Sequence, residues 1–187
     1  MRRRLALSLA LAAVAVLAHG AYLPAKARVA QGLLQHAWTK TLEQGEPNRP
    51  WPWADTHPVA RLRAPEHDVD LIVLAGATGS SLAFGPGHVA HSGVPGSDDT
   101  VVFGGHRDTH FRFLQRLAVG DALEVQAADG RVRRYRVAGA EVTDSSDSVL
   151  RLDDDSKTLA LVTCYPFDAL RAGGTQRYVV SAHGVSL

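Results

Sequence analysis

Short apolar runs separated by turn residues dominate the chain from Val59 onward. Segments such as VDLIVLAG, TVVFGG, ALEVQA, TLALVT and RYVVSAHGV are rich in Val, Leu and Ile, and clusters of Gly, Asp or Pro separate them. Runs of four to eight such residues between turn clusters are typical of strands. Seven or eight short strands with little helix predict an all-β barrel or sandwich over residues 59–187.

Two local features are expected inside this β domain. The stretch DALEVQAADGRVRRYRVAG, residues 121–139, predicts a hairpin that turns at its Ala-Asp-Gly. In its second strand we expect Val132, Tyr135 or Val137 to face the core while the four arginines stay in water. The segment HFRFLQRLAVGD, residues 110–121, predicts a short helix with one apolar face.

The first 23 residues indicate a membrane address. Three arginines precede LALSLALAAVAVLA, residues 5–18, which carries no charge. Basic residues before an apolar run favour a cytoplasmic N-terminus and an exported remainder. Counting to Leu23 gives a usable span, since a spanning helix needs about 20 residues. The small residues Ala18 and Gly20 also fit a cleaved signal peptide. We expect a single-pass anchor in the cytoplasmic (inner) membrane, with the rest of the chain on the periplasmic side.

Residues 24–58 are expected to join this anchor to the β domain. Val29, Leu33 and Ala37 recur at helical spacing, which predicts an amphipathic helix from Pro24 to about Gly45. The following EPNRPWPWADTHP contains four prolines. Because each proline removes a backbone donor and fixes φ, an extended connector is expected there.

Composition narrows the possible function classes. The chain is 45% hydrophobic and 21% charged, which is ordinary for a globular protein. Nucleic-acid-binding domains usually have a strongly basic surface, whereas this chain has a formal net charge of only +1, so no nucleic-acid partner is expected. The single cysteine excludes an intramolecular disulfide and is either an inert buried residue or a reactive thiol.

Three chemically distinct residues stand at the boundaries of predicted strands. Cys164 ends an apolar strand, His106 follows TVVFGG, and Arg177 opens the last strand. A thiolate nucleophile needs a proton partner, which an imidazole supplies. A guanidinium can stabilise the negative charge of a tetrahedral intermediate without losing its own proton to the thiolate. The pattern favours covalent acyl transfer, while an inert Cys164 stays an open alternative.

The segments around these residues resemble one protein family. LVTCYPF, GGHRDTHF and GGTQRYVVSAH are similar to the Cys, His and Arg motifs of sortases, in the family's order. The chain looks closest to the proteobacterial branch called class GN, related to class D. The resemblance implies an eight-stranded β-barrel with short helices. It also implies that the protein cleaves the C-terminal sorting signal of a secreted protein and transfers the acyl group to an amine acceptor.

The resemblance also implies a role for each site residue. Cys164 corresponds to the nucleophile, His106 to the acid/base, and Arg177 to the oxyanion and substrate partner. We further expect Thr163 and Asp108 to contact substrate, with a turn role as the alternative for Asp108. The family's Thr-Leu-x-Thr-Cys signature reads ALVTC here, ending at Cys164. The missing Thr lies on the strand rather than at its reactive end, so it bears on substrate choice more than on catalysis.

Neither a metal nor a cofactor is expected. His88 and His91 form His-x-x-His, and His106 and His110 are four apart, but no helix aligns either pair for zinc. Acidic groups that invite calcium are better explained as solvated turns. These groups are Asp98, Asp99, Asp144, Asp147, Asp153, Asp154 and Asp155.

Two other functions stay open from sequence. One is a different extracytoplasmic thiol hydrolase, although His precedes Cys here and the order in cell-wall peptidases is the reverse. The other is a non-enzymatic, membrane-anchored β-barrel that binds a partner and keeps an inert cysteine. A native thiol that reacts with alkylating agents would argue against the binding barrel. Capture of the acyl group by an added amine would distinguish a transpeptidase from a thiol hydrolase.

Overall fold

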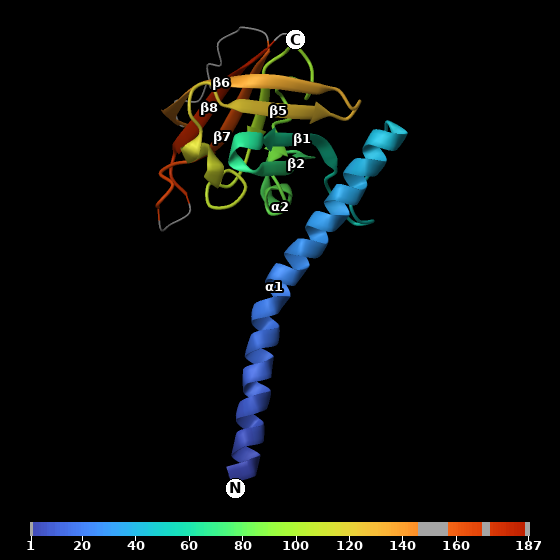
Figure 1. The fold of residues 1–187 in the computed structure, drawn as a ribbon, viewed down its shortest axis with the longest axis vertical. Helices are drawn as coiled ribbons and strands as arrows, with labels where there is room; N and C mark the ends of the chain where they lie inside the picture. Colours follow the sequence, from blue (N-terminus) through green and yellow to red (C-terminus); the bar gives the residue numbers. More distant parts are fainter. Residues whose placement is uncertain (1, 146–156, 170–172, 186–187) are drawn as a thin grey trace.

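Eight strands close into a barrel from which a long helix projects (Figure 1). The structure is a computed structural model and describes residues 2–145, 157–169 and 173–185. The strands are β1 (Pro58–Ala64), β2 (Val69–Ala75), β3 (Gly87–His88), β4 (Val101–Gly104), β5 (Ala122–Ala127), β6 (Val132–Asp144), β7 (Thr158–Cys164) and β8 (Gln176–Gly184). The helices are α1 (Arg2–Gln44), η1 (Pro65–His67), α2 (Gly79–Leu82) and η2 (Arg112–Arg116). The predicted eight-stranded all-β barrel with short helices is confirmed.

The strand order brings the ends of β4 and β7 and the start of β8 together. Around the barrel the order is β1-β2-β3-β4-β7-β8-β6-β5, and β5 pairs with β1 to close it. β7 runs parallel to β4 on one side and antiparallel to β8 on the other. Parallel strands end at the same edge of a sheet, and an antiparallel neighbour begins there. Residues at these three boundaries therefore share one rim of the barrel.

Within a strand, alternate residues point into the barrel, and these side chains are mostly apolar. In β1 and β5 every second residue is buried, as the two-residue period of a strand requires. The segment around η2 adds Phe111, Phe113 and Leu114 to the same core, so its predicted apolar face is confirmed. Tyr135 of β6 is also buried there, and burial raises the pKa of its phenol because the charged form would lose hydration.

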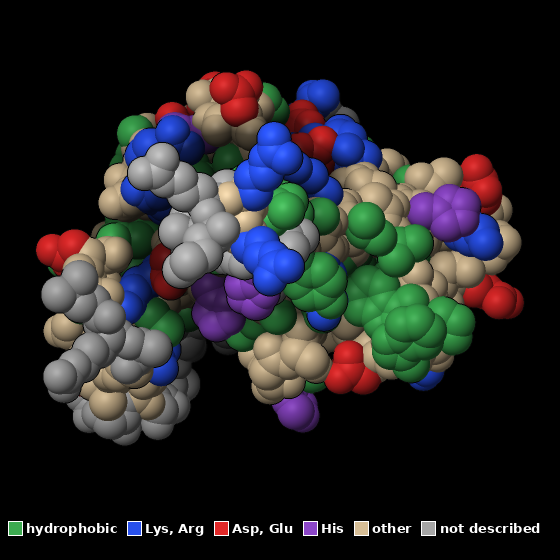
Figure 2. Space-filling model, turned by 90° about the horizontal axis from the view of Figure 1, so that it is seen from below, with side chains coloured by type: hydrophobic (Ala, Val, Ile, Leu, Met, Phe, Trp, Pro, Cys, Tyr) green, Lys and Arg blue, Asp and Glu red, His purple; other side chains and the backbone are tan. Residues whose placement is uncertain are grey.

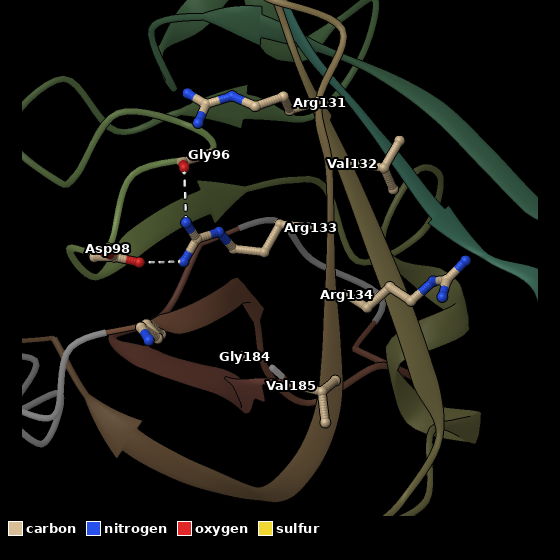
Figure 3. Close-up of a pocket in the computed structure, with 9 residues that line it drawn as sticks. Gly96, Asp98, Arg131, Val132, Arg133, Arg134, Gly184 and Val185 are labelled. Atoms are coloured by element: carbon tan, nitrogen blue, oxygen red, sulfur yellow. Dashed lines mark hydrogen bonds and ion pairs between the residues drawn. The ribbon is translucent and has the colours of Figure 1, made fainter. Parts of the chain in front are cut away.

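The predicted hairpin is confirmed, but its second strand alternates differently. β5 and β6 are antiparallel partners, with Tyr135 and Val137 inside the barrel and Val132 42% exposed. A two-residue period cannot place Val132 on the same face as the other two. Arg133 has the inward parity instead, and its guanidinium donates to Asp98 at 2.6 Å and to the Gly96 carbonyl at 3.0 Å (Figure 3).

The helix α1 is longer than the sequence predicted. It runs without a break from Arg2 to Gln44, through Pro24, where a separate helix was expected to begin. A proline inside a helix costs one hydrogen bond and bends the axis rather than always ending it. Figure 1 shows that the helix changes direction along its length. Gly45, at a φ of 71°, follows the end of the helix. In the part of the chain described, no helix is long and apolar enough to cross a membrane.

The second half of α1 is packed on the barrel. Leu34 and Trp38 form a small core with Ile72 and Leu74 of β2. The same helix is hydrogen-bonded to the loop after α2, where the Gln31 side-chain amide donates to the Phe84 carbonyl at 2.7 Å. A helix with no apolar partner would not hold one fixed place, so this buried stripe is what attaches α1 to the domain.

The connector after α1 also contacts the barrel. The Trp51 ring meets Phe84 edge-on at 5.0 Å, and the Thr56 hydroxyl donates to the Ala75 carbonyl. Ser80 at α2 donates to the Asp55 carboxylate at 2.6 Å.

On the face seen from below, hydrophobic side chains gather toward one side, while charged side chains of both signs are spread over it (Figure 2).

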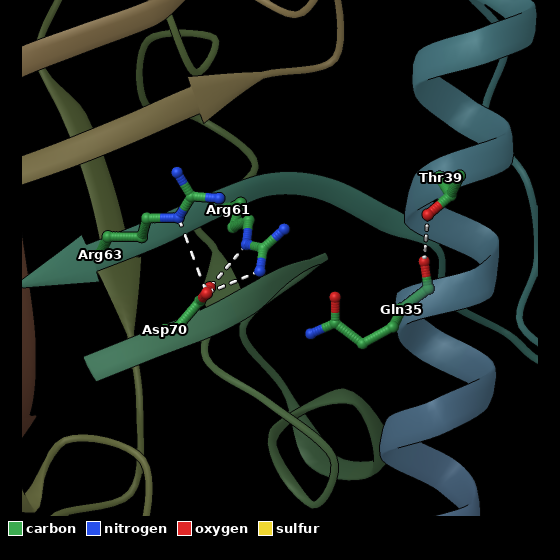
Figure 4. Close-up of polar contacts among 5 residues, drawn as sticks. All are labelled: Gln35, Thr39, Arg61, Arg63 and Asp70. Atoms are coloured by element: carbon green, nitrogen blue, oxygen red, sulfur yellow. Dashed lines mark hydrogen bonds and ion pairs between the residues drawn. The ribbon is translucent and has the colours of Figure 1, made fainter. Parts of the chain in front are cut away.

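Charged side chains pair across β1 and β2 on the outside of the barrel. Arg61 donates twice to the carboxylate of Asp70, both at 2.6 Å, and Arg63 lies 3.6 Å from the same carboxylate (Figure 4). The Arg61 hydrogen bond holds the pKa of Asp70 below its usual value. Because these groups are partly in water, the pair fixes strand register more than it adds stability. On α1, the Thr39 hydroxyl bonds back to the Gln35 carbonyl (Figure 4).

Candidate active site

Cys164 and Arg177 are direct partners across two strands. Cys164 is the last residue of β7, and the antiparallel ladder pairs it with Arg177 near the start of β8. Residues directly opposite in such a ladder have Cα atoms about 4.5–5.5 Å apart and project their side chains on the same face. The thiol is free and half-buried, so strand pairing holds it beside a guanidinium while leaving it accessible.

His106 reaches the same rim from β4. The parallel ladder matches Gly104 with Val162, and the Gly105 N–H donates to the Val162 carbonyl at 3.1 Å. A Cβ at Gly105 would lie 2.7 Å from the Phe111 ring, so only glycine allows this close approach. The exposed His106 follows immediately, two residues beyond the end of β4.

One groove of about 540 Å³ contains all three residues. Its apolar wall comes from the segment around α2, from the residue that follows β3, from β4 and from β7. These wall residues are Ala77, Leu82, Val89, Val102 and Val162. The end of β6 adds polar groups at Thr143, Asp144 and Ser145. The groove therefore combines an apolar wall with a thiol, an imidazole and a guanidinium. The predicted trio is brought together in the fold.

The guanidinium of Arg177 is held by its own loop. Its Nη1 donates to the Gly174 and Gln176 carbonyls, both at 2.9 Å. These bonds use one nitrogen of a planar group that has five N–H donors. The arginine is thus oriented by backbone while its further donors stay available to bind an oxyanion or a peptide carbonyl.

Thr163 and Asp108 occupy different surroundings from the trio. Thr163 is buried, and its hydroxyl donates to the Gly105 carbonyl at 2.7 Å. It lines the groove but also links the cysteine strand to the histidine loop. Asp108 is 78% exposed and lines a neighbouring hollow of about 570 Å³ with Tyr165. Substrate contact by either residue stays a prediction.

The other histidines lie apart from the groove. His88 bonds the Gly93 carbonyl at 2.9 Å and the Ser92 hydroxyl at 3.1 Å. His110 lines a third hollow, and burial, helped by nearby His106, lowers its pKa. Within residues 2–145, 157–169 and 173–185, no group of three His, Cys, Asp or Glu side chains is arranged to hold a metal ion.

Several acidic candidates for calcium have identified partners. The Asp98 carboxylate accepts from Arg133, which lowers its pKa, and Asp99 accepts from Ser97 at 3.3 Å. Asp144 accepts from the Thr175 hydroxyl at 2.6 Å. The remaining candidates, Asp147 and residues 153–155, lie outside the described residues.

No local pattern in the sequence singles out Arg107, which the structure places beside the groove. Arg107 is only 6% exposed and donates to the Ala169 carbonyl at 3.0 Å, in the loop that follows Cys164. Its position directly after His106 is the only signal that the sequence contains. The apolar wall residues Ala77 and Leu82 were also missed, because their distance from the cysteine in sequence hides their closeness in the fold.

The arrangement is suited to covalent chemistry on an acyl group. A thiolate attacks a carbonyl carbon, an imidazole carries protons to and from the reacting groups, and a guanidinium stabilises an oxyanion. Within the described chain no hydrogen bond joins the Cys164 thiol to the His106 ring. Catalytic hydrogen bonds are often long without substrate and tighten when it binds.

Comparisons with known proteins identify the class to which this fold and site belong. The model of the Sortase domain family matches residues 62–185. Sortase D of Bacillus subtilis (strain 168) is 31% identical over 120 residues, covering 64% of this chain and 60% of that protein. A Clostridium perfringens Sortase D5 transpeptidase is 25% identical with a TM-score of 0.64, covering 85% of this chain and 99% of that one. Sortase A from Corynebacterium diphtheriae is 25% identical with a TM-score of 0.62, covering 86% and 84%.

The chain belongs to the sortase family. The predicted family is confirmed. The similarity to two sortase D proteins agrees with the predicted relation to class D. The matched region spans 60% of the length of the curated relative. Membership of class GN stays a prediction.

Proposed function

We propose that this chain is a membrane-tethered cysteine transpeptidase. It cleaves the C-terminal sorting signal of a secreted protein and transfers the acyl group to an amine. The observation that carries the proposal is the single groove that holds Cys164, His106 and Arg177, two of them paired directly across β7 and β8. Membership of the sortase family supports the same reaction class.

The first half of the reaction forms a thioester. The Cys164 thiolate attacks the scissile carbonyl carbon, and the negative charge that moves to the carbonyl oxygen is stabilised by Arg177. As the tetrahedral intermediate collapses, the C–N bond breaks and protonated His106 gives its proton to the departing amine nitrogen. The acyl group then remains on sulfur, and His106 is neutral.

The second half transfers that acyl group. Neutral His106 accepts a proton from the incoming amine as its nitrogen attacks the thioester carbon. The C–S bond breaks, the sulfur leaves as thiolate, and the new amide is released. The site returns to a thiolate and an imidazolium, so no oxidant, metal or cofactor is needed for the balance of atoms and charge.

The groove suggests how the signal binds. Its wall of Ala77, Leu82, Val89, Val102 and Val162 would receive apolar side chains of an extended peptide. Burying one such side chain contributes about 1.5–3 kcal/mol. An apolar residue a few positions from the scissile bond would therefore fix the peptide in register with Cys164.

We also propose that the basic and apolar residues 1–23 form a single-pass anchor in the cytoplasmic (inner) membrane. Three arginines before an uncharged run favour an N-terminus in the cytoplasm. The barrel would then work on the periplasmic side, where secreted substrates pass. A cleaved signal peptide is the alternative outcome, and sequencing the N-terminus of the mature protein distinguishes the two.

Cys164→Ala tests the proposed reaction. Loss of the nucleophile removes the covalent route, so transfer of a peptide onto an added amine should fall to background while the far-ultraviolet spectrum and unfolding temperature are kept. Mass spectrometry should detect an acyl adduct on the wild-type thiol. Hydrolysis with no capture by the amine would indicate a thiol hydrolase. A native thiol that resists alkylation, with no adduct, would indicate a binding barrel.

A further inference from the structure

We propose that Arg107 is a positioning residue that holds His106 beside Cys164. The inference rests on the proposed function, and it concerns the loops on either side of the reacting pair. Arg107 directly follows the histidine, and its side chain reaches a loop that begins directly after the cysteine. The pair of loops is thereby joined by a contact that lies outside the reacting groove.

The burial of Arg107 needs an explanation. Arginine is almost never fully buried unless it is paired, because burying a charge without hydrogen bonds costs much free energy. Here 6% of the residue is exposed, and Nη2 donates to the Ala169 carbonyl at 3.0 Å across 62 residues of sequence. Asp108 lies 3.7 Å away but is 78% exposed, and an ion pair with so exposed a partner contributes little. The hydrogen bond to Ala169 therefore ties the buried guanidinium to the loop after Cys164.

A second contact completes a bracket around the histidine. On the other side of His106, the Gly105 carbonyl accepts from the Thr163 hydroxyl at 2.7 Å. Thr163 directly precedes Cys164, and Ala169 follows it by five residues. The residues before and after the histidine are therefore tied to the segments before and after the cysteine. We call these two contacts, Thr163 to Gly105 and Arg107 to Ala169, the histidine bracket.

The loop after Cys164, to which Arg107 is hydrogen-bonded, is packed against the barrel. The loop after the cysteine is held by aromatic contacts, with the Tyr165 ring stacked on Tyr178 at 6.2 Å and Phe167 meeting Tyr178 at 5.2 Å. Phe167 and Tyr178 also pack against the barrel core. A hydrogen bond to a loop packed in this way restrains Arg107, and through the backbone it restrains His106.

The Arg107 contact of the bracket lies outside the groove in which substrate is proposed to bind. Arg107 lines the hollow beside Asp108 and Tyr165, and it does not line the groove that holds Cys164. Loss of the contact should therefore slow the chemical step and leave binding of the sorting peptide unchanged. A misplacement of about 1 Å between reacting groups costs up to about a hundredfold in rate.

The experiment compares Arg107→Met and Arg107→Lys with a matched control. Arg133→Met is the control, because Arg133 is also partly buried and donates to a distant backbone carbonyl, that of Gly96, at the other end of the barrel. We expect Arg107→Met to lower kcat for peptide transfer about 10- to 100-fold with KM unchanged within about twofold. Arg107→Lys, which keeps a donor, should recover part of the loss. Arg133→Met should keep the wild-type kcat.

A second readout needs no turnover. In protein labelled at histidine, the ring signals of His106 should broaden or shift in Arg107→Met and remain as in wild type in Arg133→Met. If wild-type protein transfers no acyl group, the proposed function fails, and the ring signals still decide whether the bracket exists. Unchanged kcat and ring signals in a folded Arg107→Met protein overturn the inference, as does a rise in KM alone. If Arg107→Met does not fold, the same measurements on Arg107→Lys decide.

Discussion

At the scale of single residues, His106 and His110 are the same side chain in different surroundings. His106 is exposed in the groove with Cys164, whereas His110 is half-buried and lines a separate hollow. Burial lowers the pKa of His110, and nearby His106 lowers it further, so both effects favour the neutral ring. Proximity in sequence therefore does not give the two histidines the same chemistry.

We expect His106→Ala and His110→Ala to differ strongly in activity. General acid/base help contributes about a hundred- to ten-thousand-fold in rate, so His106→Ala should lose that much peptide transfer. His110→Ala should stay within about tenfold of wild type, because its ring does not line the groove. Steady-state transfer rates of both purified variants check this, with His91→Ala as an exposed control. A larger loss in His110→Ala would mean that the acid/base has been assigned to the wrong histidine.

Arg177→Lys separates the geometry of the oxyanion partner from its charge. A lysine keeps the positive charge but loses the planar fork that Arg177 presents while its Nη1 is bound to the Gly174 and Gln176 carbonyls. Losing one oxyanion donor costs about a hundred- to a thousand-fold in turnover. We expect a comparable loss of transfer, while alkylation of Cys164 by iodoacetamide continues at its wild-type rate.

Both measurements are made on the same protein samples, so that misfolding is visible as a change in alkylation. Near-wild-type transfer by Arg177→Lys would reduce Arg177 to a structural residue at the start of β8. The reacting site would then be a Cys164 and His106 pair.

At the scale of elements, α1 offers two adjacent leucines in opposite environments. Leu34 is fully buried against β2, whereas Leu33 is 39% exposed. Leu34→Ala should lower the free energy of unfolding by about 2–5 kcal/mol, because the lost side chain leaves a cavity under the helix. Leu33→Ala changes helix propensity equally and should stay within about 1 kcal/mol of wild type. Urea unfolding of both variants checks this, and equal effects would mean that α1 is not docked in solution.

Sequence predicted the elements that carry a strong local signal. The hairpin of β5 and β6 has its turn residues and apolar runs in one continuous stretch, and it was found. β3 is only two residues long, Gly87–His88, and no periodic pattern can show so short a strand. A separate amphipathic helix was expected to begin at Pro24, but α1 runs through this residue, because one missing donor does not decide the end of a long helix.

The candidate site was predicted in its residue types but not in its supports. Strand ends and family motifs single out Cys164, His106 and Arg177, and the fold brings the three into one groove, while their catalytic roles stay predictions. The hydroxyl of Thr163 and the guanidinium of Arg107 contact the neighbouring loop instead of projecting into open solvent, and such contacts exist only once β4 and β7 are aligned. Packing between distant segments leaves no period in the sequence, so local patterns could not show these two supporting contacts.

At the scale of the whole molecule, the barrel and α1 are joined into one body. Leu34 and Trp38 of α1 pack on Ile72 and Leu74 of β2. The connector adds the hydrogen bond from the Thr56 hydroxyl to the Ala75 carbonyl. β2 leads directly into the segment of α2, whose Leu82 lines the groove that contains Cys164. The part of the chain that precedes the barrel therefore supports one wall of the groove.

Two truncations separate tethering from this support. Removing residues 1–23 deletes the proposed anchor but keeps Leu34 and Trp38, through which α1 packs on β2. We expect this protein to leave the membrane fraction, to unfold within about 2 °C of the full chain, and to keep transfer activity on a soluble peptide. Unfolding is measured in the same detergent buffer for all proteins.

Removing residues 1–58 should act on stability instead. It deletes Leu34 and Trp38, and each loss of this kind costs about 2–5 kcal/mol. For a domain of this size 1 kcal/mol shifts the unfolding temperature by about 2–4 °C, so a fall of about 10 °C or more is expected. Transfer activity should fall with it, since the wall at Leu82 loses its backing. An unchanged unfolding temperature would show that the barrel is stable without α1. Membrane binding by the protein that lacks residues 1–23 would place the tether elsewhere.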